Sequence, residues 1–208
     1  MATGFLGTKP LLSVLTETGH HDLAVRLFQS RTFPSWGYEV EQGATSVWER
    51  WDSFTKEHGF DGIAGKNNAA MNSFSHYAFG AVMQWAFQTL AGIDTDGPGY
   101  RHILIRPNPP TVGATGEPTP IDWVRARYDS LRGRITSEWR TTGADFELQI
   151  TIPPNTAATV FLPAKDATSV TEGGKPLDAA PGVKLLRTEP GRTVLAVESG
   201  SYRFQARR

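Results

Sequence analysis

Aromatic and acidic side chains are concentrated in residues 36–52, the part of this sequence with the clearest chemical meaning. Three tryptophans, one tyrosine and four carboxylates occur within these seventeen residues. Flat rings cover the C–H faces of a pyranose, and carboxylates accept its hydroxyl hydrogens or transfer protons at the anomeric carbon. The segment therefore indicates carbohydrate chemistry. The alternative is a buried aromatic hairpin that leads into a helix and carries surface acids.

Glu49 fits two interpretations. Ser46 and Glu49 have the Ser/Thr-x-x-Glu spacing of a capping box, in which the Glu49 side chain would only bond back to the Ser46 N–H at a helix start. Alternatively, Glu49 is a catalytic carboxylate that lies beside Trp48 and Trp51. The spacing alone leaves both interpretations open.

Four other side chains are candidates for a sugar site. Trp36 is a stacking platform or a core anchor. Glu39 and Glu41 are predicted to point to the same side of an extended strand, where one of them reaches sugar hydroxyls or both are solvated. His76, at the start of an apolar helix, is by itself most simply a hydrogen-bonded core histidine.

Composition excludes several classes of function. The 208 residues include 21 basic and 21 acidic side chains, so the chain has no electrostatic footprint for nucleic acid or an anionic membrane. With no cysteine and five scattered histidines, we expect no disulfide, no metal and no other cofactor. No segment approaches the roughly 20 apolar residues of a membrane span, and residues 1–10 lack a leader pattern. Cytoplasm is the default localisation, although a truncated chain would have lost any leader.

Helical patterns occupy residues 1–97. Thr8 is predicted to cap the first helix, with Pro10 in its first turn and Gly19 as its stop. Further helices are predicted over residues 21–29, from Thr45 or Ser46 onward, and over residues 74–92. The last of these is apolar on nearly every face, as only a buried helix is.

Alternating patterns replace helical ones after the turn-rich residues 94–99. Nine short strands are predicted, over residues 102–106, 123–128, 133–139, 146–152, 158–162, 168–172, 183–187, 193–198 and 202–206. Strands at this spacing predict an antiparallel β-sandwich. The fold class is therefore α+β with two domains, a helical domain over 1–97 and a sandwich over 98–208.

The helical domain does not look complete. Four helices, one of them apolar on every face, do not enclose a core, so this face needs partners that the sequence does not contain. We expect the chain to be the C-terminal end of something longer. The alternative is that the sandwich, or a second copy of the chain in a homo-oligomer, covers the helices.

Motifs throughout the chain resemble one known family. The closing motifs of the bacterial α-L-rhamnosidases of glycoside hydrolase family 78 are similar to this sequence in the same order. The similar segments are residues 3–8, 33–38, 41–51, 71–80, 99–100, 103–107, 126–130, 133–139, 153–156 and 158–160. Nearly the whole chain is covered.

The resemblance implies the last helices of an (α/α)6 barrel followed by the family's C-terminal β-sandwich. Family members cleave terminal α-L-rhamnose from glycosides with inversion, using one glutamic acid as proton donor and a second glutamate to activate water. By its place in the Gly-Ala-Thr-Thr-x-Trp-Glu pattern, the second glutamate corresponds to Glu49, and a sugar-contacting histidine corresponds to His76. The donor would lie in an upstream barrel half that this chain lacks. Ser46 replaces the usual second threonine and keeps the hydroxyl.

The resemblance thus implies a rhamnoside substrate, with Glu49 as base and His76 as a binding residue, in a fragment that is inactive alone. The residue types add Trp36 and Glu41 as expected binding residues. The competing hypothesis is a non-catalytic module, a carbohydrate-binding or architectural sandwich with a helical adaptor. Convergence of Glu49, His76 and Trp36 on one open concave surface would favour the enzyme. A buried Glu49 that lines no cavity would favour the module.

Overall fold

The computed structural model describes residues 3–63, 71–111 and 121–208, and the chain forms two compact units. The first, called the helical unit, comprises Met1–Trp85 and Pro110–Pro120. The second, called the sandwich unit, comprises Ala86–Pro109 and Ile121–Arg208. No helix in the described residues is long and apolar enough to cross a membrane.

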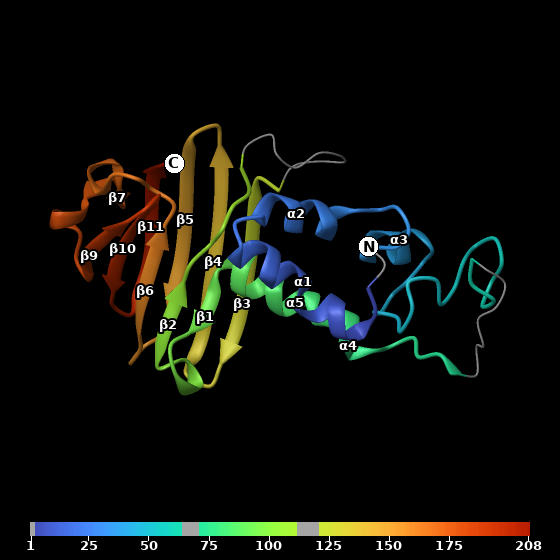
Figure 1. The fold of residues 1–208 in the computed structure, drawn as a ribbon. Helices are drawn as coiled ribbons and strands as arrows, with labels where there is room; N and C mark the ends of the chain where they lie inside the picture. Colours follow the sequence, from blue (N-terminus) through green and yellow to red (C-terminus); the bar gives the residue numbers. More distant parts are fainter. Residues whose placement is uncertain (1–2, 64–70, 112–120) are drawn as a thin grey trace. The chain divides into compact units, whose positions relative to one another are not determined.

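The helical unit begins with two helices packed side by side (Figure 1). Its helices are α1 (Phe5–Glu17), α2 (His21–Gln29), α3 (Trp36–Glu41), α4 (Tyr77–Gly80) and α5 (Val82–Trp85). The bounds predicted for α2 are confirmed. The predicted start of α1 is wrong, because Thr8 lies inside the helix, where its hydroxyl donates to the Gly4 carbonyl at 3.0 Å instead of capping the end. Pro10 is likewise internal.

The helix predicted from Thr45 or Ser46 does not form. The third helix comes earlier in the chain, as α3, and Ser35 caps it by accepting the Tyr38 N–H at 3.0 Å. Residues 44–50 are irregular because their backbone bonds a distant segment instead of a preceding turn. The Glu49 N–H donates to the Ser73 carbonyl at 2.9 Å, and the His76 N–H donates to the Val47 carbonyl at 2.8 Å.

The single helix predicted over residues 74–92 is divided. It consists of α4, α5 and the π-helical η2 (Ala86–Ala91), of which η2 belongs to the sandwich unit. Tyr77 is 86% exposed and Met83 is 51% exposed, so the described residues do not cover every face of this apolar segment. Among the described residues, this segment is therefore buried on some faces only, and the expectation that its remaining apolar face needs further partners stays a prediction.

The last carbonyls of η2 all receive donors from the sandwich unit. The Thr89 carbonyl accepts the Asn108 N–H at 2.9 Å. The Leu90 and Ala91 carbonyls accept the Trp139 Nε1–H and the Ser137 hydroxyl, each at 2.6 Å. Terminal helix carbonyls have no partner within the helix, so these bonds replace a cap. The chain then turns at a glycine, Gly92.

Gly92 has φ +77° and lies against the backbone of Pro107. A Cβ atom at this position would meet the Pro107 nitrogen at 2.1 Å. Only glycine fits both the positive φ and this close approach. The turn lets the Gly92 carbonyl accept the Arg106 N–H at 2.8 Å, which starts the first sheet.

Two sheets form the sandwich unit (Figure 1). The five-stranded sheet has the order β1-β2-β6-β10-β9, and the six-stranded sheet has the order β3-β4-β5-β11-β7-β8. The bounds are β1 Ile93–Thr95, β2 His102–Ile105, β3 Trp123–Ser130, β4 Gly133–Thr142, β5 Asp145–Ile152, β6 Ala157–Leu162, β7 Thr171–Glu172, β8 Lys175–Pro176, β9 Val183–Glu189, β10 Arg192–Val197 and β11 Gly200–Arg207.

The predicted sandwich is confirmed, with local differences. Among the strands of the described residues, every pairing is antiparallel except that of β2 with β6, which is parallel. The short strands β1 and β8 were not predicted. The strand predicted over residues 168–172 is reduced to β7, because the Asp166 carboxylate accepts the Thr168 N–H at 2.9 Å and caps a 3-10 turn, η4 (Ala167–Ser169), in its first half.

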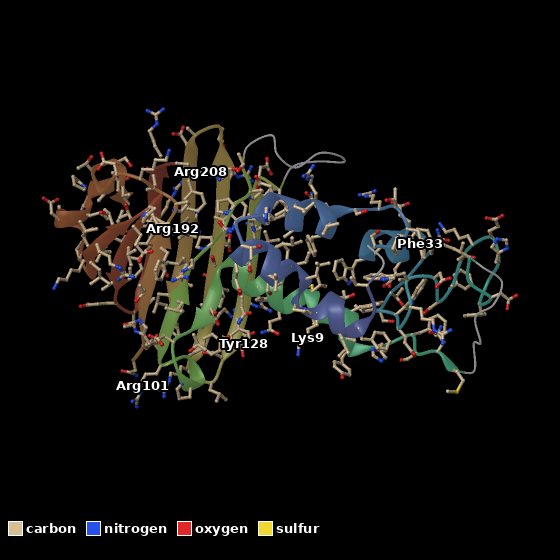
Figure 2. All side chains as sticks on the ribbon, viewed as in Figure 1. Lys9, Phe33, Arg101, Tyr128, Arg192 and Arg208 are labelled. Atoms are coloured by element: carbon tan, nitrogen blue, oxygen red, sulfur yellow. The ribbon has the colours of Figure 1, made fainter. Side chains whose placement is uncertain are left out.

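Side chains from both sheets form one core. Along β4 the inward positions Ile135, Ser137 and Trp139 are buried and alternate with outward polar residues, the period-2 pattern of a half-buried strand. At the start of β10 the guanidinium of Arg192 donates to the Pro107 and Phe161 carbonyls at 3.1 and 3.3 Å (Figure 2). Burial lowers the pKa of Arg192 to about 10.

Candidate functional site

Two segments of the helical unit that are distant in sequence place Glu49 and His76 in one local structure. Residues 46–49 lie against residues 73–76 through the two backbone hydrogen bonds given above. The Ser46 hydroxyl also donates to the Phe74 carbonyl. The two residues that the family motifs single out therefore lie on two segments that are hydrogen-bonded to each other.

Glu49 is half-buried, and its carboxylate is held on one side only. Its Oε2 accepts the Ser73 N–H at 2.7 Å. Its Oε1 makes no hydrogen bond with a described residue. The capping-box interpretation is wrong, because no helix begins at Ser46 and the carboxylate bonds Ser73 instead. A carboxylate that is oriented through one oxygen keeps the other for a proton.

His76 is oriented by α4 and by neighbouring rings. It is the N-cap of α4, where its Nδ1 accepts the Ala78 N–H at 3.3 Å. Because Nδ1 is the acceptor, the neutral imidazole carries its hydrogen on Nε2. The ring stacks on Phe5, with centroids 4.6 Å apart, and on Tyr77 at 5.4 Å. The half-buried His76 thus presents an N–H donor of fixed direction.

Trp36, the first residue of α3, is attached to α4 through its indole nitrogen. Its Nε1–H donates to the Phe79 carbonyl at 3.0 Å. Its ring meets Trp51 edge-on at 5.2 Å, and Trp51 stacks on the Phe79 ring at 4.0 Å. Trp36 is half-buried, so these contacts favour the core-anchor interpretation for most of its surface. Its role in stacking on a sugar stays a prediction.

The predicted strand at Glu39 and Glu41 is wrong, since both residues lie on α3. They do not point together. Glu41 is exposed and forms a 3.0 Å ion pair with Arg31, whereas Glu39 is buried. The structure shows no contact of Glu41 with Glu49 or His76, and its role in substrate binding also stays a prediction.

Glu39 is the polar residue near this site whose burial the sequence did not predict, since it was named only together with Glu41 as a residue of an extended strand. Glu39 is only 2% exposed. Its Oε2 lies 3.5 Å from the Trp48 nitrogen, and its buried Oε1 has no hydrogen-bond partner in the described part of the chain. Burial raises the pKa of Glu39 to about 8, although the Trp48 N–H opposes this shift. Glu39 is therefore a neutral acid at pH 7 that contacts the residue before Glu49.

The raised pKa of Glu39 predicts a loss of stability with rising pH. The unfolded chain releases the Glu39 proton near the ordinary pKa of 4.5, and the folded chain releases it only near 8. The free energy of unfolding therefore falls as the pH rises between these two values and is constant above them. We therefore compare the unfolding free energy of Glu39→Gln with that of the wild type at pH 5 and at pH 9. We expect this difference to shift in favour of the variant by at least about 1 kcal/mol from pH 5 to pH 9, since each pKa unit corresponds to about 1.4 kcal/mol. Urea unfolding of the variant and the wild type at pH 5 and pH 9 measures this difference. The matched control is Glu41→Gln on the same helix, and equal changes in both variants would contradict the prediction.

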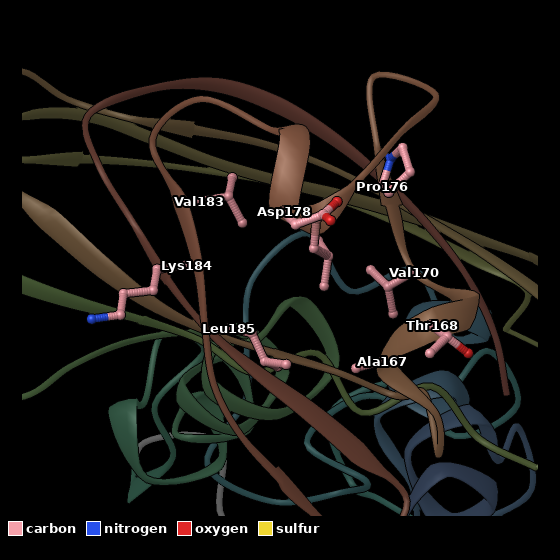
Figure 3. A pocket seen from close by; sticks show the side chains of 9 residues that line it. Ala167, Thr168, Val170, Pro176, Asp178, Val183, Lys184 and Leu185 are labelled. Atoms are coloured by element: carbon pink, nitrogen blue, oxygen red, sulfur yellow. The ribbon is translucent and has the colours of Figure 1, made fainter.

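The sandwich unit contains an apolar hollow of about 590 Å³ (Figure 3). It is lined mainly by the aliphatic side chains of Ala167, Val170, Leu177, Val183 and Leu185. The Lys184 side chain at its edge points away from them (Figure 3). Thr168, Asp178 and Lys184 are its polar lining residues. Its one carboxylate, Asp178, is not the pair of carboxyl groups that glycoside hydrolysis requires.

Comparisons with known families match both parts of the chain. Residues 1–90 match the model of the bacterial alpha-L-rhamnosidase 6 hairpin glycosidase domain. Residues 92–176 match the model of the bacterial alpha-L-rhamnosidase C-terminal domain. The order of the two matches is that of the helical unit followed by the sandwich.

Similar proteins and structures agree with these matches. An alpha-L-rhamnosidase of Streptomyces avermitilis is 43% identical over 98% of this chain and 18% of its own length, and one of Formosa agariphila is 34% identical over 100% of this chain and 21% of its own. A crystal structure of the Streptomyces avermitilis enzyme complexed with L-rhamnose covers the whole chain at 42% identity with a TM-score of 0.81. A crystal structure of the alpha-L-rhamnosidase of Aspergillus terreus also covers the whole chain, at 29% identity with a TM-score of 0.74. The chain spans about a fifth of the relatives' length.

Proposed function

The chain belongs to the bacterial α-L-rhamnosidases, as the end of the six-hairpin glycosidase domain followed by the C-terminal domain, and from this premise we propose that it supplies the general base of an inverting α-L-rhamnosidase. The substrate is a glycoside with a terminal α-L-rhamnose. Glu49 is the proposed base. The proposal includes domain ranges of 1–97 for the barrel helices and 98–208 for the sandwich.

The observation that supports this role is the one-sided attachment of the Glu49 carboxylate. Its Oε2 is fixed by the Ser73 N–H at 2.7 Å, on the segment that leads into His76. Its Oε1 has no hydrogen-bond partner among the described residues, so it is proposed to take the proton. The Nε2–H of His76 is suited to donate to a sugar hydroxyl, since Nδ1 is occupied by the Ala78 N–H.

The proposed reaction assigns one proton transfer to this chain. Glu49 Oε1 takes a proton from water while the water oxygen bonds to the anomeric carbon on the face opposite the leaving group. The bond from that carbon to the glycosidic oxygen breaks, and a second carboxylic acid gives this oxygen its proton. That donor is proposed to lie outside the 208 residues, roughly 6.5–9.5 Å from the base across the scissile bond, the separation that leaves room for water.

A chimera tests the proposal. This chain replaces the matching segment of the Streptomyces avermitilis relative, and the chimera is given an aryl α-L-rhamnoside in an NMR tube. We expect β-L-rhamnose to appear first and the α anomer to appear only later by mutarotation, because direct attack by water inverts the anomeric centre. Initial formation of α-L-rhamnose would indicate a covalent intermediate and would exclude Glu49 as a base that activates water for direct attack.

A further inference from the structure

One row of side chains crosses five strands on the outer face of the six-stranded sheet. The strand register places Trp123 on β3 opposite Arg140 on β4, and Arg140 opposite Glu147 on β5. Glu147 in turn lies opposite Gln205 on β11, and Gln205 lies opposite Thr171 on β7. These positions alternate with core residues such as Trp139, Phe146 and Phe204, so they face away from the core. With strands about 4.8 Å apart, the row is about 19 Å long.

The surface along this row is hollowed. A hollow of about 200 Å³ lies over β3, β4 and β5 between Trp123 and Gln149, and one of about 510 Å³ continues to Thr171 and Gln205. Arg140 and Glu147 line both. The two hollows therefore make a single trough across the sheet, which we call the sheet trough. Trp123, 56% exposed, lies at its β3 end.

The charges beside the sheet trough are paired, with one exception. Arg125 contacts Glu138 at 2.9 Å, and Arg203 contacts Glu147 at 2.8 Å. Arg140 makes neither an ion pair nor a hydrogen bond through its side chain among the described residues. The trough therefore offers the guanidinium of Arg140 between the exposed indole of Trp123 and the carboxylate of Glu147, whose charge is compensated by Arg203. Gln205 and Thr171 follow beyond Glu147.

We propose that the sheet trough binds an acidic oligosaccharide. A pyranose ring stacks on the exposed face of Trp123, and the carboxylate of a uronic acid residue forms a bidentate pair with Arg140. Gln205 and Thr171 then meet hydroxyls farther along the saccharide. The other acidic and basic side chains nearby neutralise one another, so a polyanion such as nucleic acid finds too little positive charge here. This site lies on the sandwich unit and does not depend on the hydrolytic function of Glu49.

Binding of trigalacturonate to the 208-residue chain, measured by isothermal titration calorimetry, tests the proposal. We expect Trp123→Ala and Arg140→Gln each to weaken binding at least tenfold, and Trp123→Tyr to retain most of it because the ring remains. Binding should weaken from 20 to 300 mM NaCl, since the pair with Arg140 is exposed and screened. The matched control is Arg134→Gln, which lies on the same face of β4 but outside both hollows and should leave affinity unchanged.

Several outcomes would overturn the proposal. They are absence of binding by the folded chain, equal affinity for neutral maltotriose, and equal effects of Arg134→Gln and Arg140→Gln. Thermal melts followed by circular dichroism are recorded for every variant, because an exposed substitution should leave the melting temperature within a few degrees. If Trp123→Ala fails to fold, Arg140→Gln and the maltotriose comparison decide the question.

Discussion

Glu49→Gln in the chimera is expected to lower kcat for an aryl α-L-rhamnoside by at least about 10², with little change in KM. Glutamine keeps the size of the side chain, but it cannot take a proton from water. Its carbonyl oxygen can still accept the Ser73 N–H, which the Glu49 carboxylate accepts at 2.7 Å. The substitution therefore removes the proposed chemistry and preserves the observed contact. Steady-state kinetics of the purified variant measures the effect.

The structural alternative for Glu49 predicts a different result. If its only task is to hold Ser73, Glu49→Gln should leave both kcat and the melting temperature close to those of the wild type, and only Glu49→Ala should lower the melting temperature. Glu41→Gln is the matched control, because Glu41 is exposed and paired with Arg31. A near-normal kcat in Glu49→Gln would move the base elsewhere.

Azide gives an independent check on the same residue. A small anionic nucleophile needs no general base, so it should partly restore turnover in the Glu49 variants only if Glu49 normally activates water on the far face of the sugar. It should do nothing for a variant that is slow because it is misfolded. Absence of rescue in a well-folded Glu49→Ala variant would count against the proposed role.

Strands were easier to predict from the sequence than helices. Alternation along residues such as Ile135, Ser137 and Trp139 reports a core face directly, because the side-chain period in a strand is two. The helix predicted at Ser46 failed because the propensity and capping signals are local, whereas residues 46–49 bond residues 73–76. Those hydrogen bonds join positions more than twenty residues apart, which no local pattern records.

The same distinction applies to the candidate site. The aromatic and acidic residues of segment 36–52, and the family motifs, indicated Glu49 and His76, which lie on two segments joined by backbone hydrogen bonds; their roles stay a prediction. Glu39 could not be distinguished from Glu41 by sequence, since both are glutamates that flank Val40. Only the turn of α3 buries one and exposes the other. Burial then gives Glu39 a pKa of about 8.

The 208-residue chain expressed alone is expected to show at least about 10⁴-fold less hydrolysis of an aryl α-L-rhamnoside than the chimera. Removal of a general acid typically costs about 10²–10⁴ in rate, and loss of the remaining barrel wall removes orientation of the substrate as well. The measurement is the release of the aryl alcohol at equal molar concentrations. A control sample with Glu49→Gln sets the level of contaminating activity.

Mixing distinguishes a missing partner from a misfolded chain. If the 208 residues fold and contribute only the base, adding the separately expressed preceding part of the Streptomyces avermitilis relative should restore turnover, and Glu49→Gln in this chain should abolish the restored activity. The donor and the base would then be shown to lie on different polypeptides, because neither part alone hydrolyses the substrate. Robust turnover by the pure chain would instead mean that both carboxyl groups lie within these 208 residues, and the proposed division of the two catalytic roles would have to be abandoned.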